Sequence, residues 1–270
     1  AALVRVALAS PARPEPAPTL IEPQPEPEAA AVPILLAQAS APDASPTAED
    51  EAIPSYRTKL PPPMTLRYEV THGSLRGNGE LSWRVRGDQY ELTLEARVAG
   101  IAALTQTSNG ALDAAGLAPR RFLDKRLGRA PMAANFQRDA AKISYSGTKK
   151  EFALRPGAQD RLSWMVQLAG IVSAEPQLAK AGARVVMFVT GSRGDAGVWV
   201  FRCLGAESIA GPGGAVDAVK FIREPRDPND TNVQVWLDPT HHELPLRAMQ
   251  KSGPSDDGYD LRLLEVRPAN

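Results

Sequence analysis

Two of the three histidines in this 270-residue chain are adjacent, at His241 and His242, with an aspartate and a glutamate beside them. Imidazole and carboxylate groups can bind a metal ion or exchange protons. Adjacent residues of an extended chain point in opposite directions, whereas a metal site within one segment needs a spacing such as i, i+4. Val235–Arg247 is therefore interpreted as two strands joined by a loop at Pro239–Leu244, with a metal or acid–base site as the alternative.

Three further polar groups could do chemistry. Asp160 and Arg161 form the most interesting pair; a helix N-cap and a sheet contact are their default roles, with ligand contact as the alternative. The run at 120–129 carries five basic residues and could meet an anionic lipid headgroup, although its alternation favours the wet face of a strand. Cys203 has no histidine at motif spacing and is interpreted as a small hydrophobe in a strand.

The overall charge and composition exclude some classes of protein. The chain has 31 basic and 31 acidic residues, so it has no general attraction for nucleic acid. One cysteine cannot form an internal disulfide. No catalytic constellation, metal site or cofactor motif is evident, so the chain is predicted to be non-enzymatic and to use no cofactor.

The N-terminal part differs in composition from the rest. Fourteen of the 25 prolines lie between Pro11 and Pro63, and the first glycine is Gly73. Residues 1–9 are interpreted as the remnant of a signal or anchor segment, and membrane contact is expected only through a missing or cleaved segment there. Residues 10–59 are predicted to be a disordered linker rich in proline, alanine and glutamate.

Residues 60–268 are predicted to form one mainly β domain. Apolar residues alternate with polar ones from Met64 onward, as in MTLRYEVT and QYELTLEARVAG, which is typical of strands with one wet face. Turn residues separate many such runs, which indicates an antiparallel meander. So many strands are expected to curl into a single half-barrel or barrel-like sheet.

One stretch, at 157–182, has helical spacing instead. Leu162, Met165, Val166 and Ala169 form one apolar stripe, which predicts one or two short helices packed on the concave face of the sheet, with Trp164 off the stripe and partly exposed. A ligand could lie between helix and sheet. The candidate ligand-lining residues are Trp83, Leu92, Leu162, Met165, Val166, Phe201 and Phe221.

Four segments together resemble the bacterial envelope family known as domain of unknown function 3108. They are LPPPMTLRYEVTHGSLRGNGELSW, SNGALDAAGLAPRRFLDKR, GAQDRLSWMVQLAG and VWLDPTHHELPLR, in the family's order and covering about 60–266. The resemblance implies an exported protein with a proline-rich N-terminal stretch and no established activity. It also implies a curved antiparallel sheet around a helix, similar in outline to periplasmic lipoprotein carriers, and it supplies no catalytic residues.

The sequence leads us to expect one of two functions. The positions of the histidines argue against a third. The first is a non-enzymatic periplasmic domain, anchored to the inner membrane through its N-terminus, that shelters an apolar or lipid-like ligand. The second is a tethered module that binds another envelope protein. The third, a hydrolase or metal enzyme, requires the histidines to converge.

Overall fold

In the part of the chain that the structure describes, the alternation of apolar and polar residues forms one continuous β-sheet with one α-helix on its concave side. The computed structural model describes residues 53–223, 225, 228, 230–253 and 258–269, all within the unit Ser45–Asn270. Within these ranges, no helix has the length and apolar character that crossing a membrane requires.

The sheet contains 15 strands in two sequential runs that are joined by the pairing of β1 with β15. The first run is β1 (Met64–His72), β2 (Leu75–Arg86), β3 (Gln89–Val98), β4 (Ile101–Asp113), β5 (Gly116–Arg126), β6 (Met132–Gln137), β7 (Lys142–Tyr145) and β8 (Glu151–Ala153). The second is β9 (Gln159–Asp160), β10 (Arg184–Thr190), β11 (Ala196–Gly211), β12 (Gly214–Arg223), β13 (Thr231–Asp238), β14 (Leu244–Ser252) and β15 (Tyr259–Pro268).

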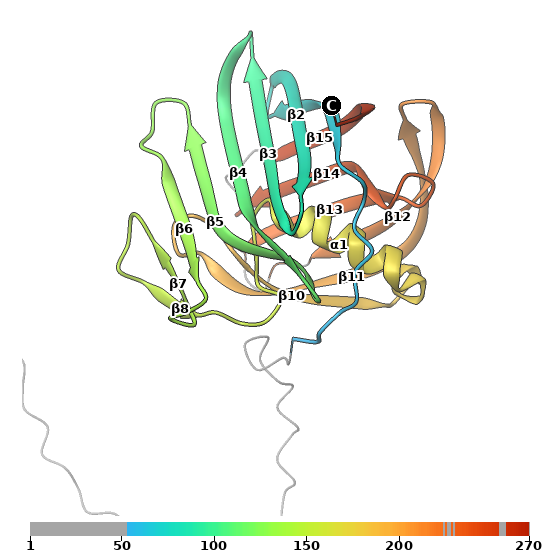
Figure 1. The fold of residues 1–270 in the computed structure, drawn as a ribbon. Coiled ribbons are helices and arrows are strands. Elements are labelled where there is room, and N and C mark those ends of the chain that lie inside the picture. The colour runs from blue at the N-terminus through green and yellow to red at the C-terminus, as the bar shows by residue number, and fades with distance from the viewer. Residues whose placement is uncertain (1–52, 224, 226–227, 229, 254–257, 270) are drawn as a thin grey trace, which may run out of the picture. The chain divides into compact units, whose positions relative to one another are not determined.

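The strand order confirms the predicted meander. Neighbours in the chain are neighbours in the sheet throughout each run, and every pair is antiparallel except β9 with β10. Side chains alternate as the sequence indicates: Leu66 and Tyr68 are buried, whereas Arg67 between them is exposed. The mainly β, single curved sheet is therefore as predicted, and it is barrel-like in outline (Figure 1).

The helix α1 (Ser163–Ala174) is buried on every side, not along one stripe as predicted. It contacts β5 from the first run and β9, β10 and β14 from the second, because the sheet curves around it (Figure 1). Trp164, expected to be partly exposed, is only 2% exposed and stacks on Phe201 with ring centroids 5.0 Å apart. A short 3-10 helix follows at Pro176–Ala179, with its proline in the first turn.

The packed domain begins before residue 60, the predicted boundary, because the chain that precedes β1 also packs on it. The backbone N–H of Lys59 donates to the carbonyl of Gly170 at 2.8 Å, and the hydroxyl of Tyr56 accepts the N–H of Val186 at 2.9 Å. Ile53 also packs against the core, so apolar anchors order residues 53–59 despite the polar composition of the segment. The remainder of the predicted linker, residues 10–52, and the predicted segment at 1–9 lie outside the described residues.

The two ends of the sheet are joined by side chains. Ser108 Oγ donates to Asp160 Oδ2 at 2.5 Å, and Gln159 Nε2 donates to the carbonyl of Leu117 at 2.8 Å. The hydroxyls of Tyr145 and Thr190 lie 2.7 Å apart. We call these six residues the seam; they connect β4, β5 and β7 with β9 and β10, where the described residues form no backbone ladder.

Candidate functional site

A pocket of about 290 Å³ lies between α1 and the concave face of the sheet. Most of its lining residues belong to β1, β3, β4, β5, β14 and β15, toward the end of the sheet where the β1–β2, β3–β4 and β5–β6 hairpins turn (Figure 1). Its apolar lining residues are Val70, Leu94, Ala96, Leu104, Phe122, Trp164, Met165, Ala248, Met249, Tyr259 and Leu261. Its polar and charged lining residues are Gln106, Asp124, Arg126, Arg161, Ser192, Arg193, Asp195 and Gln250, with Gly191 beside them.

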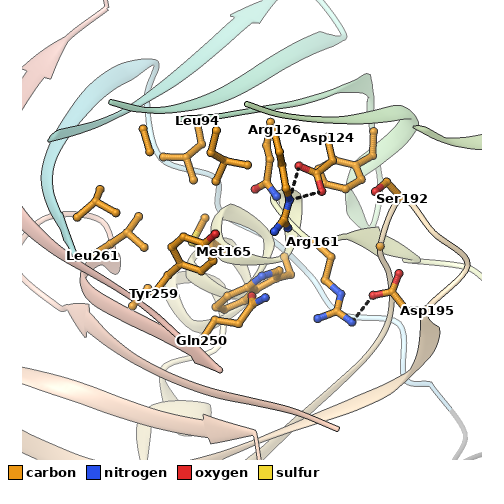
Figure 2. A pocket seen from close by; sticks show the side chains of 18 of the residues that line it. Leu94, Asp124, Arg126, Arg161, Met165, Ser192, Asp195, Gln250, Tyr259 and Leu261 are labelled. Carbon is orange, nitrogen blue, oxygen red and sulfur yellow. Dashed lines mark hydrogen bonds and ion pairs between the residues drawn. The ribbon is translucent and has the colours of Figure 1, made fainter. Parts of the chain in front are cut away.

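The pocket has two chemically different sides. Figure 2 shows Leu94, Tyr259 and Leu261 on one side of the space, and the charged residues of β5 and of the β10–β11 loop on the other. Met165 projects between them from α1 (Figure 2). A ligand that fills this pocket would therefore contact apolar carbon on one side and fixed charges on the other.

Two arginine–aspartate ion pairs make up much of the charged side. Arg126 donates through Nε to Asp124, at 3.2 Å to Oδ2 and 3.4 Å to Oδ1. Arg161 Nη2 donates to Asp195 Oδ2 at 2.7 Å. Asp124 is nearly buried, at 8% side-chain exposure, so it depends on its arginine partner, whereas Asp195 is half exposed.

Arg161 is the best anchored of these charges. Its Nη1 donates to Thr231 Oγ1 at 3.0 Å, and its guanidinium carbon lies 4.6 Å from the ring centroid of Trp199. Burial lowers the pKa of Arg161, and the nearby Asp195 opposes that shift. The expected sheet contact of Arg161 is therefore confirmed, and the same side chain also lines the pocket.

Asp160, the residue before it, caps α1 without occupying the N-cap position. Its Oδ1 accepts the N–H groups of Leu162 and Ser163 at 2.9 and 2.8 Å, while its own N–H donates to Ser163 Oγ. The N-cap is Leu162, because Asp160 is held in β9 by pairing with Thr190. Complete burial raises the pKa of Asp160 to about 6, against the opposing effect of these hydrogen bonds.

Met165 is the one candidate ligand-lining residue among the side chains that line this pocket. The other six lie in the hydrophobic core, each at most 1% exposed: Trp83, Leu92, Leu162, Val166, Phe201 and Phe221. They were predicted to line a ligand site because they are large or lie on the apolar stripe of the helix. In the structure, the sheet packs directly against this part of the core. The pocket lies farther along the strands, toward the hairpin end.

Met165→Ala is expected to destabilise the domain by about 1–2 kcal/mol, below the ~2–5 kcal/mol usual for a packed methionine. The reason is that Met165 already borders the pocket, so its removal enlarges existing space instead of creating a new cavity. Leu168→Ala on the same helix is the matched control, because Leu168 is fully buried and does not line the pocket. Urea denaturation measures both; equal losses would show that the pocket side of α1 is packed like the core.

The sequence missed most of the charged side of the pocket. One signal for it exists in β5, where Phe122, Asp124 and Arg126 alternate and so share the concave face. Two charged residues on the apolar face of a strand are unusual unless they form an ion pair and contribute to a binding site. The residues from the β10–β11 loop, Ser192 to Asp195, carry no comparable pattern, because a loop has no periodicity.

The adjacent histidines form part of a hairpin loop, as predicted, between β13 and β14. His241 Nδ1 lies 2.7 Å from Asp238 Oδ2, and Asp238 Oδ1 also accepts the backbone N–H of Thr240 at 2.8 Å. His242 has a left-handed backbone, with φ 57°. Among the described residues, there is no group of three or more His, Cys, Asp or Glu side chains that could hold a metal ion.

Comparison with known proteins identifies one matching family. The family model described as protein of unknown function (DUF3108) matches residues 67–256. No curated protein matches the chain.

Three solved structures are similar to parts of this chain. A β-barrel-like DUF1849 protein from Brucella abortus matches 78% of this chain and 100% of its own, with 11% identity and a TM-score of 0.50. MucB in complex with MucA(peri) matches 77% of this chain and 50% of its own, with 12% identity and a TM-score of 0.32. The Pseudomonas aeruginosa MucA/MucB complex matches 77% and 53%, with 15% identity and a TM-score of 0.28. At 11% identity, the likeness to the DUF1849 protein concerns the fold alone.

Proposed function

The chain belongs to the DUF3108 family, whose function is unknown, and we propose that it is a non-enzymatic domain that shelters a small apolar or lipid-like ligand. The pocket between α1 and the sheet is the observation that carries this proposal. Its volume of about 290 Å³ is near the lower end of the ~300–1,000 Å³ range of small-molecule sites, so it suits one small ligand or one acyl chain.

The construction of the pocket supports binding better than catalysis. Its polar groups are arginines, aspartates, glutamines and a serine, and no histidine or cysteine is among them. Ser192 has no histidine partner to activate it among the residues lining the pocket, as nucleophilic catalysis requires. Asp124 and Asp195 each accept a hydrogen bond from an arginine, so both carboxylates are already engaged within the protein.

The proposed location is the periplasm, with the domain tethered to the inner membrane through its N-terminus. The composition of residues 10–52 supports this, because proline-rich sequences favour extended chains, which can hold a folded domain at a distance from a membrane. A fusion of the natural full-length protein to alkaline phosphatase, which is active only after export, tests the location. An inactive fusion would contradict it.

Replacing Ala96 by phenylalanine is expected to weaken ligand binding at least about tenfold, because the new ring projects from β3 into the pocket. The probe is N-phenyl-1-naphthylamine, an uncharged dye that fluoresces in apolar surroundings. Ala102→Phe is the matched control: Ala102 lies on the adjacent strand, opposite Arg97, and is exposed. Absence of dye binding to the unaltered domain would contradict the proposal, as would equal binding by the two variants.

A module that binds another envelope protein is the second candidate, and exposed apolar side chains favour it. Leu75, Ile101 and Leu127 are 55%, 59% and 67% exposed and lie at the three hairpins near the pocket. If a partner protein uses this rim, Leu75→Ser with Ile101→Ser would abolish its capture and leave dye binding unchanged. The two roles are therefore separable by experiment.

A further inference from the structure

The charged side of the pocket offers hydrogen-bond donors that the protein leaves open. Arg126 binds Asp124 through Nε alone, and neither of its terminal amino groups has a hydrogen-bond partner among the residues that the structure describes. These two amino groups form a planar fork that matches the two oxygens of a carboxylate or phosphate. Figure 2 shows the guanidinium of Arg126 directed into the space that Arg161 also faces.

The neighbouring charges favour an anion at this place. Arg161 Nε is buried and lacks a hydrogen-bond partner in the described part of the chain. Arg193 is exposed and forms no ion pair with a described residue. Three arginines against Asp124 and Asp195 give the charged side a net charge of +1, and each of the two acids already has an arginine partner. An anion would therefore meet hydrogen-bond donors without a partner. A cation would meet only carboxylates that are already paired with an arginine.

We propose that the pocket binds a single-chain anionic amphiphile, with its oxyanion on Arg126 and its hydrocarbon chain along Leu94, Tyr259 and Leu261. This assignment rests on the proposed function and specifies the class of its ligand. The volume of about 290 Å³ accommodates one chain and excludes the bulk of a lipid with several. The headgroup lies at the charged side, where Ser192, 4% exposed, adds a hydroxyl donor.

Three ligands with the same twelve-carbon chain test the headgroup: dodecanoate, dodecyl phosphate and 1-dodecanol. Each displaces N-phenyl-1-naphthylamine from the full chain, below the concentration at which micelles form. Both anions are expected to bind at least about tenfold more tightly than the alcohol, which corresponds to about 1.4 kcal/mol. The ratio between the two anions identifies which oxyanion the fork prefers.

Two substitutions on β5 are expected to change anion binding in opposite directions. Arg126→Gln removes the fork and should reduce both anions to the affinity of the alcohol. Asp124→Asn removes a negative charge beside the fork and should tighten both anions severalfold, without changing the affinity for the alcohol. Lys125→Gln is the matched control, because Lys125 is adjacent, exposed and on the opposite face of the strand.

The outcomes separate this assignment from the function on which it rests. Equal affinities of the anions and the alcohol would overturn the headgroup site and leave a purely apolar carrier. Failure of all three ligands and of the dye to bind would overturn both. Unchanged anion affinity in the Arg126→Gln variant would overturn the role of Arg126, because the fork would then contribute nothing to binding.

Discussion

Asp160→Ala is expected to destabilise the domain by about 3–5 kcal/mol. The alanine leaves the buried N–H groups of Leu162 and Ser163 without their acceptor, and Ser108 loses its bond to Asp160 while it keeps its contact with Tyr90. Loss of a helix cap costs about 0.5–2 kcal/mol, and each buried polar group left unsatisfied costs about 1–3 kcal/mol. The same change removes one of the links across the seam. Urea denaturation at pH 5, where the folded state holds the proton of Asp160, measures the loss; a change below about 1 kcal/mol would show that water replaces the carboxyl group.

Asp160→Asn is the matched variant, and its effect is expected to depend on pH. The asparagine oxygen can accept both N–H groups, and its amide can donate to Ser108, whose hydroxyl then donates to Tyr90 at 2.8 Å. The folded-state pKa of Asp160, about 6, is above the ordinary 3.8. The folded state therefore holds this proton more tightly, so the stability due to Asp160 is complete below about pH 4 and is lost as pH rises through 6.

The rise of the pKa of Asp160 from 3.8 to about 6 corresponds to about 3 kcal/mol. The free energy of unfolding of the wild type minus that of Asp160→Asn should therefore fall by most of this amount, about 2–2.5 kcal/mol, between pH 4 and pH 7. Taking the difference removes the contribution of other carboxylates, such as Asp238 and Asp260, whose pKa values are lowered. A flat difference across this range would contradict the buried, titrating carboxylate.

Gly110→Ala is expected to destabilise the domain by at least about 3 kcal/mol, at the top of the range for overpacked sites. A Cβ at Gly110 would lie 2.2 Å from the carbonyl oxygen of Ala118 and 2.8 Å from the Cα of Pro119. Both are backbone atoms of β5, and they can move only if β4 and β5 separate at the bulge between Asn109 and Gly110. Thermal melts monitored by circular dichroism measure the change.

Gly213→Ala provides the control for the Gly110 variant. Gly213 lies in the turn between β11 and β12, has no left-handed φ, and a Cβ there would meet nothing within 4 Å. The expected change is under about 1 kcal/mol, typical of a surface site. Similar losses at Gly110 and Gly213 would show that the separation of β4 and β5 adapts to a methyl group.

Local pattern was sufficient to predict most of the secondary structure. Strict alternation placed Leu66 and Tyr68 on the buried face because the period of a strand is two, and this holds whatever the sheet does elsewhere. The change to helical spacing located α1 for the same reason. A loop at His241 and His242 followed from the proline and aspartate before it, since those residues favour a turn locally.

Features that depend on distant segments were not predictable in this way. Trp164 lies off the apolar stripe, yet it is buried, because β11 brings Phe201 against it from 37 positions away in the sequence. The packing of residues 53–59 depends on Gly170, which leaves the helix backbone accessible to Lys59. The charged side of the pocket combines β5, Arg161 and the β10–β11 loop, and no periodicity relates these segments.

The two outermost strands of the sheet are also its shortest, and this limits how other chains can add to it. β8 has three residues and β9 has two, so each exposes few unpaired backbone groups at the margin of the sheet. Lys149, Lys150 and Glu151 place charge at the β8 margin. Short and charged margins oppose edge-to-edge pairing, domain swapping and fibril growth. A protein partner that recruits this domain is therefore expected to recognise side chains on its surface instead of extending its sheet by another strand.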